Sequence, residues 1–246
     1  MPKFIFFILL TFILSCFAET PRKVPVMLDS IPHDQTHFTQ GLFFDGKELV
    51  ESTGGYGGSG LYRCTPEGDV LDSARLAERY FGEGSVAVGG DIFYLTWKSK
   101  KAFIYNRKPF KPKGSFSIPT EGWGLTFWNN ALLMSNGSSE LLQIALGGFQ
   151  VVGTIVVTDE GRPLRNLNEL EVVGNTLYAN IWTTGLIAVI SLPEGKVTQY
   201  IDMTKKASDI RSRYPNADVL NGIAFDGKFL WITGKNWPQI YKIQMP

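Results

Sequence analysis

The chain of 246 residues contains little cysteine, little histidine and almost no net charge. Of its two cysteines, Cys16 ends an N-terminal apolar run, so we expect no disulfide framework. The other, Cys64, is expected to be a packed core residue rather than a catalytic thiol. A formal charge of +1 excludes the basic surface of a nucleic-acid-binding protein. The two histidines, His33 and His37, are too isolated to indicate a metal site by themselves.

Long helix-forming runs are also rare in this chain. Aromatic residues make up 13% of it, and turn formers are frequent, with 26 glycines and 13 prolines. This balance is typical of an all-β domain with many turns. Hydrophobic residues account for 44% of the chain, which is enough for the core of one large domain. Ordinary apolar content and low net charge exclude an intrinsically disordered chain.

Residues 1–18 are typical of an export signal, with one positive charge, an apolar run and small residues at the end. The run is too short for a comfortable membrane span. Cleavage after Ala18 would give a soluble exported protein. The four residues that end at Cys16 loosely match a bacterial lipoprotein box, and lipidation there would anchor the protein. An uncleaved anchor is a third alternative. All three predict a location outside the cytoplasm, in the periplasm, in the cell envelope or as a secreted protein.

One pattern recurs five times along the chain: a polar or glycine-rich step leads into a strand, a tight turn and a second strand. The step residues lie 40 to 53 positions apart, at Gln40, Glu83, Trp123, Glu169 and Gly222. Each copy contains a hairpin turn built from glycine, asparagine or aspartate. A repeat of about 40 to 50 residues with four strands is typical of a propeller blade. We therefore predict an all-β, five-bladed β-propeller over residues 23–246.

The two ends of the predicted propeller must pair to close the ring. A strand over residues 23–28 is expected to complete the last blade beside the C-terminal strand, residues 239–244, and so to cover an exposed edge. One short surface helix is predicted between Thr204 and Asn216, because a threonine precedes a charged stretch and a proline follows it.

The inner strands of a propeller converge on a central channel, so the five steps should meet there. Side chains expected at this mouth are Gln40, Glu83, Trp123, Asn168 with Glu169, and Asn221 from the steps, and Trp97, Trp182 and Lys235 from the ends of the second strands. A small polar pocket with aromatic walls suits small ligands or peptide ends. Packing between blades is an equal alternative for any one tryptophan, and Lys235 is equally well explained as a surface charge.

Only the second copy has a lone acid at its step, in Gly82-Glu83-Gly84. Two aromatic residues, Tyr80 and Phe81, precede it. A carboxylate in apolar surroundings has a raised pKa, which suits a group that takes and returns a proton. Glu83 is therefore the candidate catalytic residue.

Nine short segments, in order over residues 32–238, resemble the plant- and bacterial-type glutaminyl-peptide cyclotransferases. They are Pro32-His33-Asp34 with Phe38-Thr39-Gln40-Gly41-Leu42, Glu51-Ser52-Thr53-Gly54, Phe81-Gly82-Glu83-Gly84, Leu95-Thr96-Trp97-Lys98, Glu121-Gly122-Trp123-Gly124-Leu125, Leu167-Asn168-Glu169-Leu170-Glu171, Ala179-Asn180-Ile181-Trp182, Val219-Leu220-Asn221-Gly222-Ile223-Ala224 and Thr233-Gly234-Lys235-Asn236-Trp237-Pro238. The resemblance implies a five-bladed propeller that cyclises the N-terminal glutamine of peptides and proteins to pyroglutamate and releases ammonia, without a cofactor or metal. We expect a monomer.

The resemblance also implies roles for individual residues. Glu83 would be the catalytic residue, and the substrate-binding positions would be Phe38, Gln40, Trp97, Trp123, Asn168, Trp182 and Lys235. Gln40, Asn168 and the Trp123 indole would hold the amide and its oxyanion. Trp97 and Trp182 would sandwich the side chain, and Lys235 would orient Glu83 or the peptide carbonyl. The chain departs from the family pattern at Gly185, where an aspartate is usual, and this puts substrate affinity in question.

Two other functions remain open from the residues alone. A lactonase-like propeller hydrolase would bind Ca²⁺ through Glu83, Asn168 and Asn221, and its activity would be lost with EDTA. A non-catalytic exported propeller would bind peptides or carbohydrate, and its function would survive Glu83→Gln.

Overall fold

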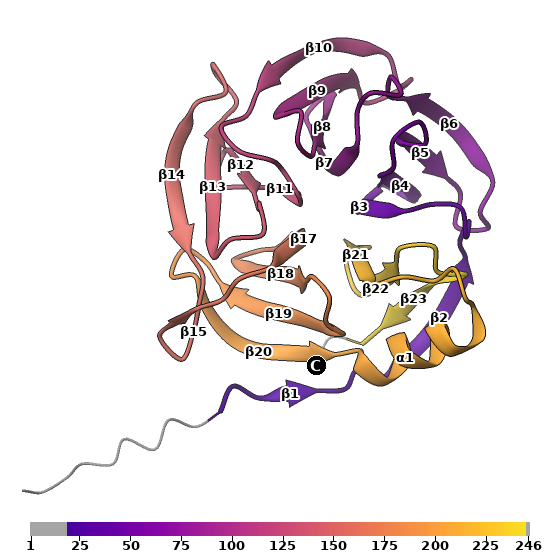
Figure 1. Cartoon of the computed structure of the whole chain (residues 1–246), viewed down its shortest axis with the longest axis vertical. Coiled ribbons are helices and arrows are strands. Elements are labelled where there is room, and N and C mark those ends of the chain that lie inside the picture. The colour runs from indigo at the N-terminus through magenta and orange to yellow at the C-terminus, as the bar shows by residue number, and fades with distance from the viewer. Residues whose placement is uncertain (1–18, 245–246) are drawn as a thin grey trace, which may run out of the picture.

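The computed structural model describes residues 19–244, and in it β-sheets surround a central axis (Figure 1). Four of the sheets have four antiparallel strands each. They consist of β3 (Thr39–Asp45), β4 (Glu48–Thr53), β5 (Gly60–Cys64) and β6 (Val70–Arg75); β7 (Gly82–Val88), β8 (Asp91–Thr96), β9 (Lys101–Asn106) and β10 (Pro112–Ser117); β11 (Leu125–Trp128), β12 (Ala131–Met134), β13 (Glu140–Ala145) and β14 (Val151–Val156); and β21 (Leu220–Phe225), β22 (Leu230–Gly234), β23 (Gln239–Ile243) and β2 (Met27–Pro32).

The remaining sheet is larger and has seven strands. Its main strands are β17 (Leu167–Val173), β18 (Thr176–Ile181), β19 (Leu186–Ser191) and β20 (Lys196–Asp202), and the two-residue strands β1 (Arg22–Lys23), β15 (Thr158–Asp159) and β16 (Arg162–Pro163) extend it. Both β1 and β15 pair with β20 in parallel, while β15 and β16 form a hairpin. These short strands cover the outer edge of the sheet, which would otherwise be open for pairing.

The prediction of a five-bladed propeller of four-stranded units is therefore wrong: within residues 19–244 four sheets are four-stranded blades, and the place between the β11–β14 and β21–β23 sheets holds the seven-stranded sheet (Figure 1). The repeat pattern in the sequence comes from the inner two strands of each copy and predicts only these. It carries no information on two-residue strands, which are too short to show an alternation of buried and exposed residues.

The ends of the chain meet where closure was predicted, but with a different strand. β2 pairs antiparallel with β23, and Ser30 lies opposite Tyr241. The paired strand is Met27–Pro32 rather than residues 23–28, because Arg22 and Lys23 pair with β20 of the neighbouring sheet. The N-terminal segment therefore bridges two sheets of the ring (Figure 1).

The single α-helix among the described residues, α1 (Thr204–Arg213), lies where the sequence predicted one. Ala207 and Ile210 are its buried residues, and both pack into the apolar cluster between the seven-stranded sheet and the β21–β23 sheet. Within residues 19–244, no helix is long and apolar enough to cross a membrane. The predicted export signal, with Cys16, lies outside the described residues.

Four inner strands share a break in register at the step position. The shifts fall between Thr39 and Gly41, Gly82 and Ser85, Leu167 and Leu170, and Leu220 and Ile223. A bulge leaves a residue unpaired and turns its side chain away from the regular pleat. Polar residues at the steps of four copies lie within these shifts: Gln40, Glu83, Asn168 with Glu169, and Asn221. The bulges therefore place their side chains near the same mouth of the channel.

Candidate active site

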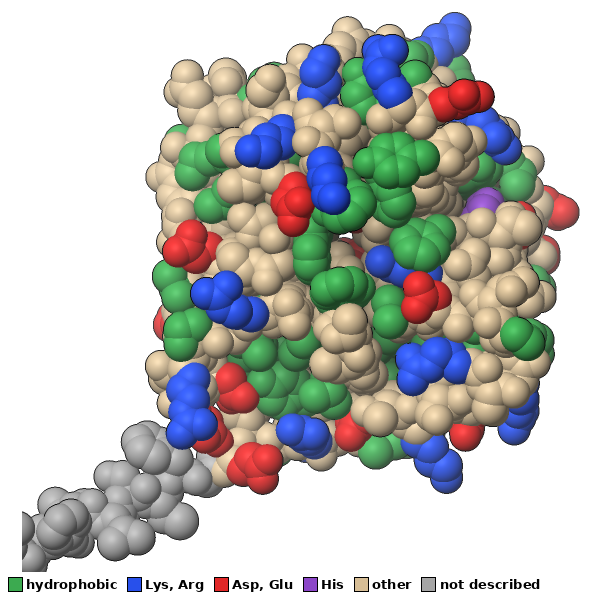
Figure 2. Space-filling model, in the orientation of Figure 1, with side chains coloured by type: hydrophobic (Ala, Val, Ile, Leu, Met, Phe, Trp, Pro, Cys, Tyr) green, Lys and Arg blue, Asp and Glu red, His purple; other side chains and the backbone are tan. Residues whose placement is uncertain are grey.

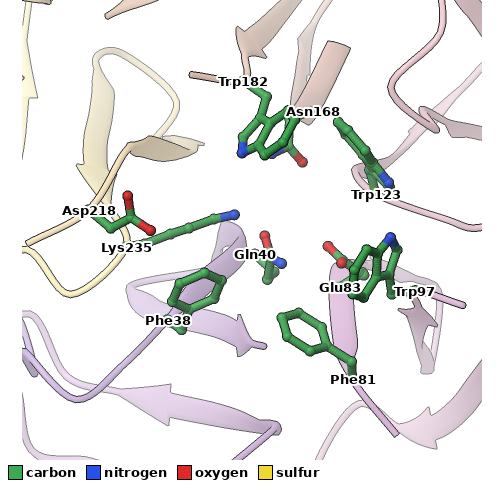
Figure 3. A pocket seen from close by; sticks show the side chains of 10 residues that line it. All are labelled: Phe38, Gln40, Phe81, Glu83, Trp97, Trp123, Asn168, Trp182, Asp218 and Lys235. Atoms are coloured by element: carbon green, nitrogen blue, oxygen red, sulfur yellow. The ribbon is translucent and has the colours of Figure 1, made fainter. Parts of the chain in front are cut away.

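A cavity of about 290 Å³ occupies this mouth (Figure 3). Its lining consists of Phe38, Gln40, Phe81, Glu83, Trp97, Trp123, Asn168, Trp182, Asp218 and Lys235. Seen from outside, the face is hollowed near its centre, and hydrophobic side chains border much of the hollow (Figure 2). All eight site residues predicted from the sequence lie in this lining, whereas their individual roles stay predictions. Phe81 and Asp218 belong to the lining as well and were not among the predicted residues.

Glu83 is the buried acid of this cavity, with only 5% of its surface exposed. The backbone around it is fixed on both sides: the Ser52 hydroxyl donates to the Glu83 carbonyl at 2.8 Å, and the Gly84 N–H donates to the Trp123 carbonyl at 2.7 Å. No side chain among residues 19–244 hydrogen-bonds to its carboxyl group. Burial raises the pKa of Glu83 well above its ordinary value; the positive charge of Lys235 opposes this shift, and the negative charge of Glu121 adds to it.

Lys235 enters the cavity from the side opposite Glu83 (Figure 3). It follows β22, is 5% exposed, and its Nζ lies 4.6 Å from the centroid of the Phe38 ring. Burial lowers the pKa of Lys235, and the negative charges of Glu83 and Asp218 oppose this effect. Each of the two buried groups therefore favours the ionised form of the other across the cavity.

Two polar atoms of the lining are buried without a hydrogen-bond partner: the indole Nε1 of Trp123, a donor, and Oδ1 of Asn168, an acceptor. An unpaired buried polar group costs about 1–3 kcal/mol. A carboxamide offers one acceptor oxygen and an NH₂ donor, so it has a matching group for each of the two atoms. The pair is therefore suited to bind an amide.

Gln40 is oriented from behind by Asn221. The Asn221 Nδ2 donates to Gln40 Oε1 at 3.2 Å and to the Thr39 carbonyl at 2.9 Å. Because its oxygen is engaged, Gln40 keeps its NH₂ group as a free donor, and the contact of this group to an oxyanion stays a prediction. Asn221, which was expected at the channel mouth, does not line the cavity and acts through Gln40.

Glu169, the other expected acid, is also outside the cavity lining. Its carboxyl oxygens accept the backbone N–H of Ile223 at 2.9 Å and that of Leu42 at 3.4 Å. It thereby connects β17 to β21 and β3. Burial and the neighbouring Glu171 raise the pKa of Glu169 well above its usual value. Its role is to tie the inner strands together.

The aromatic wall consists of edge-to-face pairs. Trp97 packs on Phe81 with ring centroids 5.5 Å apart, and Trp182 packs on Trp123 at 5.4 Å. Trp182 is 41% exposed and therefore lies at the rim. Because Trp97 and Trp182 belong to separate pairs, their proposed sandwich around a substrate side chain stays a prediction.

The sequence analysis missed two lining residues, Phe81 and Asp218, and only the first could have been predicted from its position in the sequence. Phe81 directly precedes the Gly-Glu-Gly step and packs on Phe38 with centroids 6.1 Å apart, so its position beside the predicted catalytic residue was a usable signal. Asp218 lies in the segment between α1 and β21, outside the repeated pattern. Its N–H donates to the Lys235 carbonyl at 2.8 Å, and no spacing rule could have placed it there.

Close packing around residue 185 explains why this chain has glycine where the family usually has aspartate. A Cβ atom on this residue would lie 2.4 Å from Cα and 2.7 Å from N of Thr204, the first residue of α1. Gly185 does not line the cavity. An aspartate here would require α1 to move, and the effect of the departure on substrate affinity stays a prediction.

The family described as Glutamine cyclotransferase matches residues 10–245. The chain belongs to the glutamine cyclotransferase family. A curated relative, the glutaminyl-peptide cyclotransferase of Arabidopsis thaliana, is 36% identical over 222 residues, which cover 87% of this chain and 69% of the relative. The crystal structure of Myxococcus xanthus glutaminyl cyclase superimposes with a TM-score of 0.85 at 32% identity, over 92% of this chain and 98% of that one.

A Bacteroides caccae protein of unknown function shares the fold at a TM-score of 0.52 and 16% identity, over 67% of this chain and 66% of that one. At this identity the likeness is one of fold alone. The function of this glutamine cyclotransferase is therefore argued from the Arabidopsis and Myxococcus relatives and from the site.

Trp123→Phe tests the unpaired indole donor of this glutamine cyclotransferase. Phenylalanine keeps an aromatic wall but removes the N–H, so we expect kcat for glutamine cyclisation to fall roughly 10²-fold. The free energy of unfolding should not fall by more than about 1 kcal/mol, because the lost donor has no partner in the free protein. Ammonia release and urea unfolding measure the two quantities. Unchanged kcat would show that this donor does not contact the reacting amide.

Gly84→Ala tests the close contact beside the catalytic step. A Cβ atom here would lie 2.7 Å from both the Leu125 N and the Trp123 O, which are backbone atoms of the next sheet. We expect a loss of about 1–3 kcal/mol in the free energy of unfolding. Because Glu83 is adjacent, kcat should fall as well.

The matched control for this substitution is Gly90→Ala in the same β7–β8 hairpin, where a Cβ atom would have no neighbour within 4 Å. It should change stability by less than about 0.5 kcal/mol. Urea unfolding compares the two variants. Equal effects would refute the steric explanation.

Proposed function

We propose that this cavity converts the N-terminal glutamine of peptides and proteins to pyroglutamate with release of ammonia, and that Glu83 moves the proton. The protein is an enzyme of the glutaminyl-peptide cyclotransferase kind, as the family match and the relatives from Arabidopsis and Myxococcus support. One observation carries the assignment of the site: a buried carboxyl group shares a small cavity with an unpaired amide-binding donor and acceptor.

Substrate binding follows from the polar groups of the lining. The γ-carboxamide oxygen accepts from the Trp123 indole and the Gln40 NH₂, while its NH₂ group donates to Asn168 Oδ1. The aliphatic part of the side chain lies against the aromatic wall. A cavity of about 290 Å³ is at the small end for ligand sites, so it admits one residue while the rest of the peptide extends past the rim.

The reaction then needs one proton transferred between two nitrogens. The α-amine nitrogen attacks the γ-carbonyl carbon, and a C–N bond forms as the oxygen becomes an oxyanion. Glu83 takes a proton from the attacking nitrogen and returns it to the leaving NH₂. The original C–N bond breaks and ammonia departs. Folding the side chain back on its own amine supplies the reactive geometry.

The raised pKa of Glu83 suits both halves of this cycle. An ordinary carboxylate, with a pKa near 4, is a weak base toward the amine. Burial raises the pKa of Glu83 and so increases its basicity, and the resulting acid holds a proton for the leaving group. The donors stabilise the oxyanion at the same time.

The structure does not bring together the three Ca²⁺ ligands, Glu83, Asn168 and Asn221, that the alternative calcium-dependent hydrolase requires. Asn221 contacts Thr39 and Gln40 and does not line the cavity that holds Glu83 and Asn168. Glutamine cyclisation should survive EDTA with its kcat unchanged, whereas lactone hydrolysis should be absent before and after the chelator. Ammonia and lactone assays on the same sample measure both. Cyclisation that stops with EDTA and returns with Ca²⁺ would contradict the assignment.

Export is a further part of the proposal. Residues 1–18 would direct the chain out of the cytoplasm, with cleavage after Ala18 or lipidation at Cys16. Mass spectrometry of the mature N-terminus from the native host distinguishes the two, because a lipidated Cys16 adds acyl mass. We also propose that the enzyme acts as a monomer, which light scattering tests.

A further inference from the structure

A second polar cluster lies outside the active-site cavity, where His33 and His37 meet Glu51 of β4. The His33 Nε2 is 3.1 Å from Glu51 Oε1, and the His37 Nδ1 is 2.7 Å from Glu51 Oε2. One donor atom from each of the three residues lies within 4.8 Å of the others. The three side chains are almost entirely buried, at 3%, 10% and 5% exposure for His33, His37 and Glu51. The sequence analysis judged the two histidines too isolated to indicate a metal site, and the fold supplies the third residue, Glu51.

The far nitrogen of each histidine ring faces an oxygen atom, and that of His33 is within hydrogen-bond distance of it. His33 Nδ1 lies 2.6 Å from the Trp237 carbonyl, so it carries the hydrogen and donates it. His37 Nε2 lies 3.7 Å from an oxygen of Asp34. Metal-binding histidines in proteins almost always have such a backbone carbonyl or carboxylate behind them, which fixes the tautomer and the ring orientation.

The position of the hydrogen on the His33 ring indicates what lies between His33 and Glu51. With the hydrogen on Nδ1, a neutral ring presents the Nε2 lone pair to a carboxylate oxygen 3.1 Å away. Two electron-rich atoms at this distance need a cation between them. The same Glu51 oxygen also accepts from the Thr39 hydroxyl at 2.7 Å, which fixes its orientation. The cation is either a second ring proton or a metal ion.

A small cavity opens on this cluster and provides an entry path. It is lined by all three residues and by Asp34 and Cys64. Two imidazole nitrogens and one carboxylate oxygen form a donor set typical of zinc, with a fourth position left for water. A tetrahedral site with bonds of 2.0–2.1 Å places its ligands about 3.3 Å apart. The two histidines contact different oxygens of Glu51, at 3.1 Å for Oε1 and 2.7 Å for Oε2, and the donor atoms of the three residues lie within 4.8 Å of one another, so a rotation of the carboxylate brings one of its oxygens into such a site.

We propose that His33, His37 and Glu51 bind one divalent transition-metal ion, with zinc as the best match, at a site separate from the active-site cavity. The segment that carries His33 and His37 continues into Phe38 and Gln40, and the Trp237 carbonyl follows Lys235 closely in the chain. The ion therefore stabilises the fold next to one wall of the active site, which keeps its shape without the ion. It takes no part in the chemistry.

Zinc binding to the purified full-length chain tests this proposal. The protein is treated with a chelator, dialysed and titrated with zinc chloride, with calorimetry and thermal unfolding as readouts. We expect one zinc ion per chain and, at zinc 100-fold above Kd, a rise in Tm of about 5–10 °C. Cobalt in place of zinc should give the visible absorption of a tetrahedral site.

Two variants make the test specific. His37→Gln keeps a donor to Glu51 but cannot bind zinc well, so affinity should fall at least ~100-fold while metal-free cyclisation stays intact. Cys64→Ser controls for binding by a thiol in the same cavity and should keep the affinity within about threefold. No zinc uptake by the wild type, or equal affinity in His37→Gln, would overturn the proposal and leave a protonated His33 as the cation. Loss of binding in Cys64→Ser alone would overturn it too.

Discussion

Replacing Glu83 by glutamine is expected to lower kcat for the cyclisation of N-terminal glutamine by about 10²–10⁴-fold without unfolding the protein. Glutamine has nearly the same shape, but it cannot take a proton from the amine or return one to the leaving nitrogen. The Glu83 carboxyl has no side-chain hydrogen bond to lose among the described residues, so the fold should be retained, while the buried Lys235 loses a compensating negative charge and stability falls somewhat. Ammonia release from glutamine-containing dipeptides measures kcat, and circular dichroism measures the fold.

Glu121→Gln is the matched control for this substitution. Glu121 is close enough to raise the pKa of Glu83 by its charge, but it does not line the cavity. The same acid-to-amide change there should leave kcat at its optimum pH within about threefold of wild type. If Glu83→Gln keeps kcat within tenfold of wild type, Glu83 is not the proton-transfer group.

Removing the charges on either side of Glu83 should move the acidic limb of the pH profile of kcat in opposite directions. The Lys235 ammonium favours the ionised form of Glu83, so Lys235→Gln raises the pKa of Glu83 further and shifts the limb to higher pH. The negative charge of Glu121 disfavours that form, so Glu121→Gln lowers the pKa and shifts the limb to lower pH. Lys235→Gln should also raise KM about tenfold if Lys235 binds the peptide carbonyl.

The measurement is kcat against pH for wild type and both variants at low ionic strength, where screening of charges is weakest. The bound amine and Glu83 titrate as a coupled pair, so the comparison uses shifts between variants rather than an assignment of either limb. Shifts in the same direction, or none for Lys235→Gln, would mean that Glu83 does not control the acidic limb.

Much of the site could be predicted because the repeat itself places it. Glycines around Glu83, and polar residues at corresponding steps such as Gln40 and Asn168, mark bulges that turn side chains toward one mouth. The close contacts of Gly84 show the physical need behind the pattern, because any side chain there would strike backbone of the next sheet. The inner strands and the position of the predicted catalytic residue could therefore be predicted from local sequence.

Several features of the fold and the site could not be predicted, because they depend on contacts between strands that are distant in the sequence. The two-residue strands of the seven-stranded sheet have no alternation to detect. Asp218 reaches the cavity on a segment outside the repeats. Cys64, expected in the core, is only partly buried at the cavity beside Glu51. The histidine cluster forms only because pairing of β4 places Glu51 beneath a loop that lies 14 to 18 residues away in the chain.

The most direct test of the account is mass spectrometry of a peptide with N-terminal glutamine after incubation with the wild-type protein and with Glu83→Gln. The account predicts that the wild type converts the peptide to its pyroglutamyl form, with one ammonia released per peptide, and that the variant leaves it almost unchanged over the same time. A wild type that releases no ammonia, or a variant that converts the peptide as fast as the wild type, would contradict it.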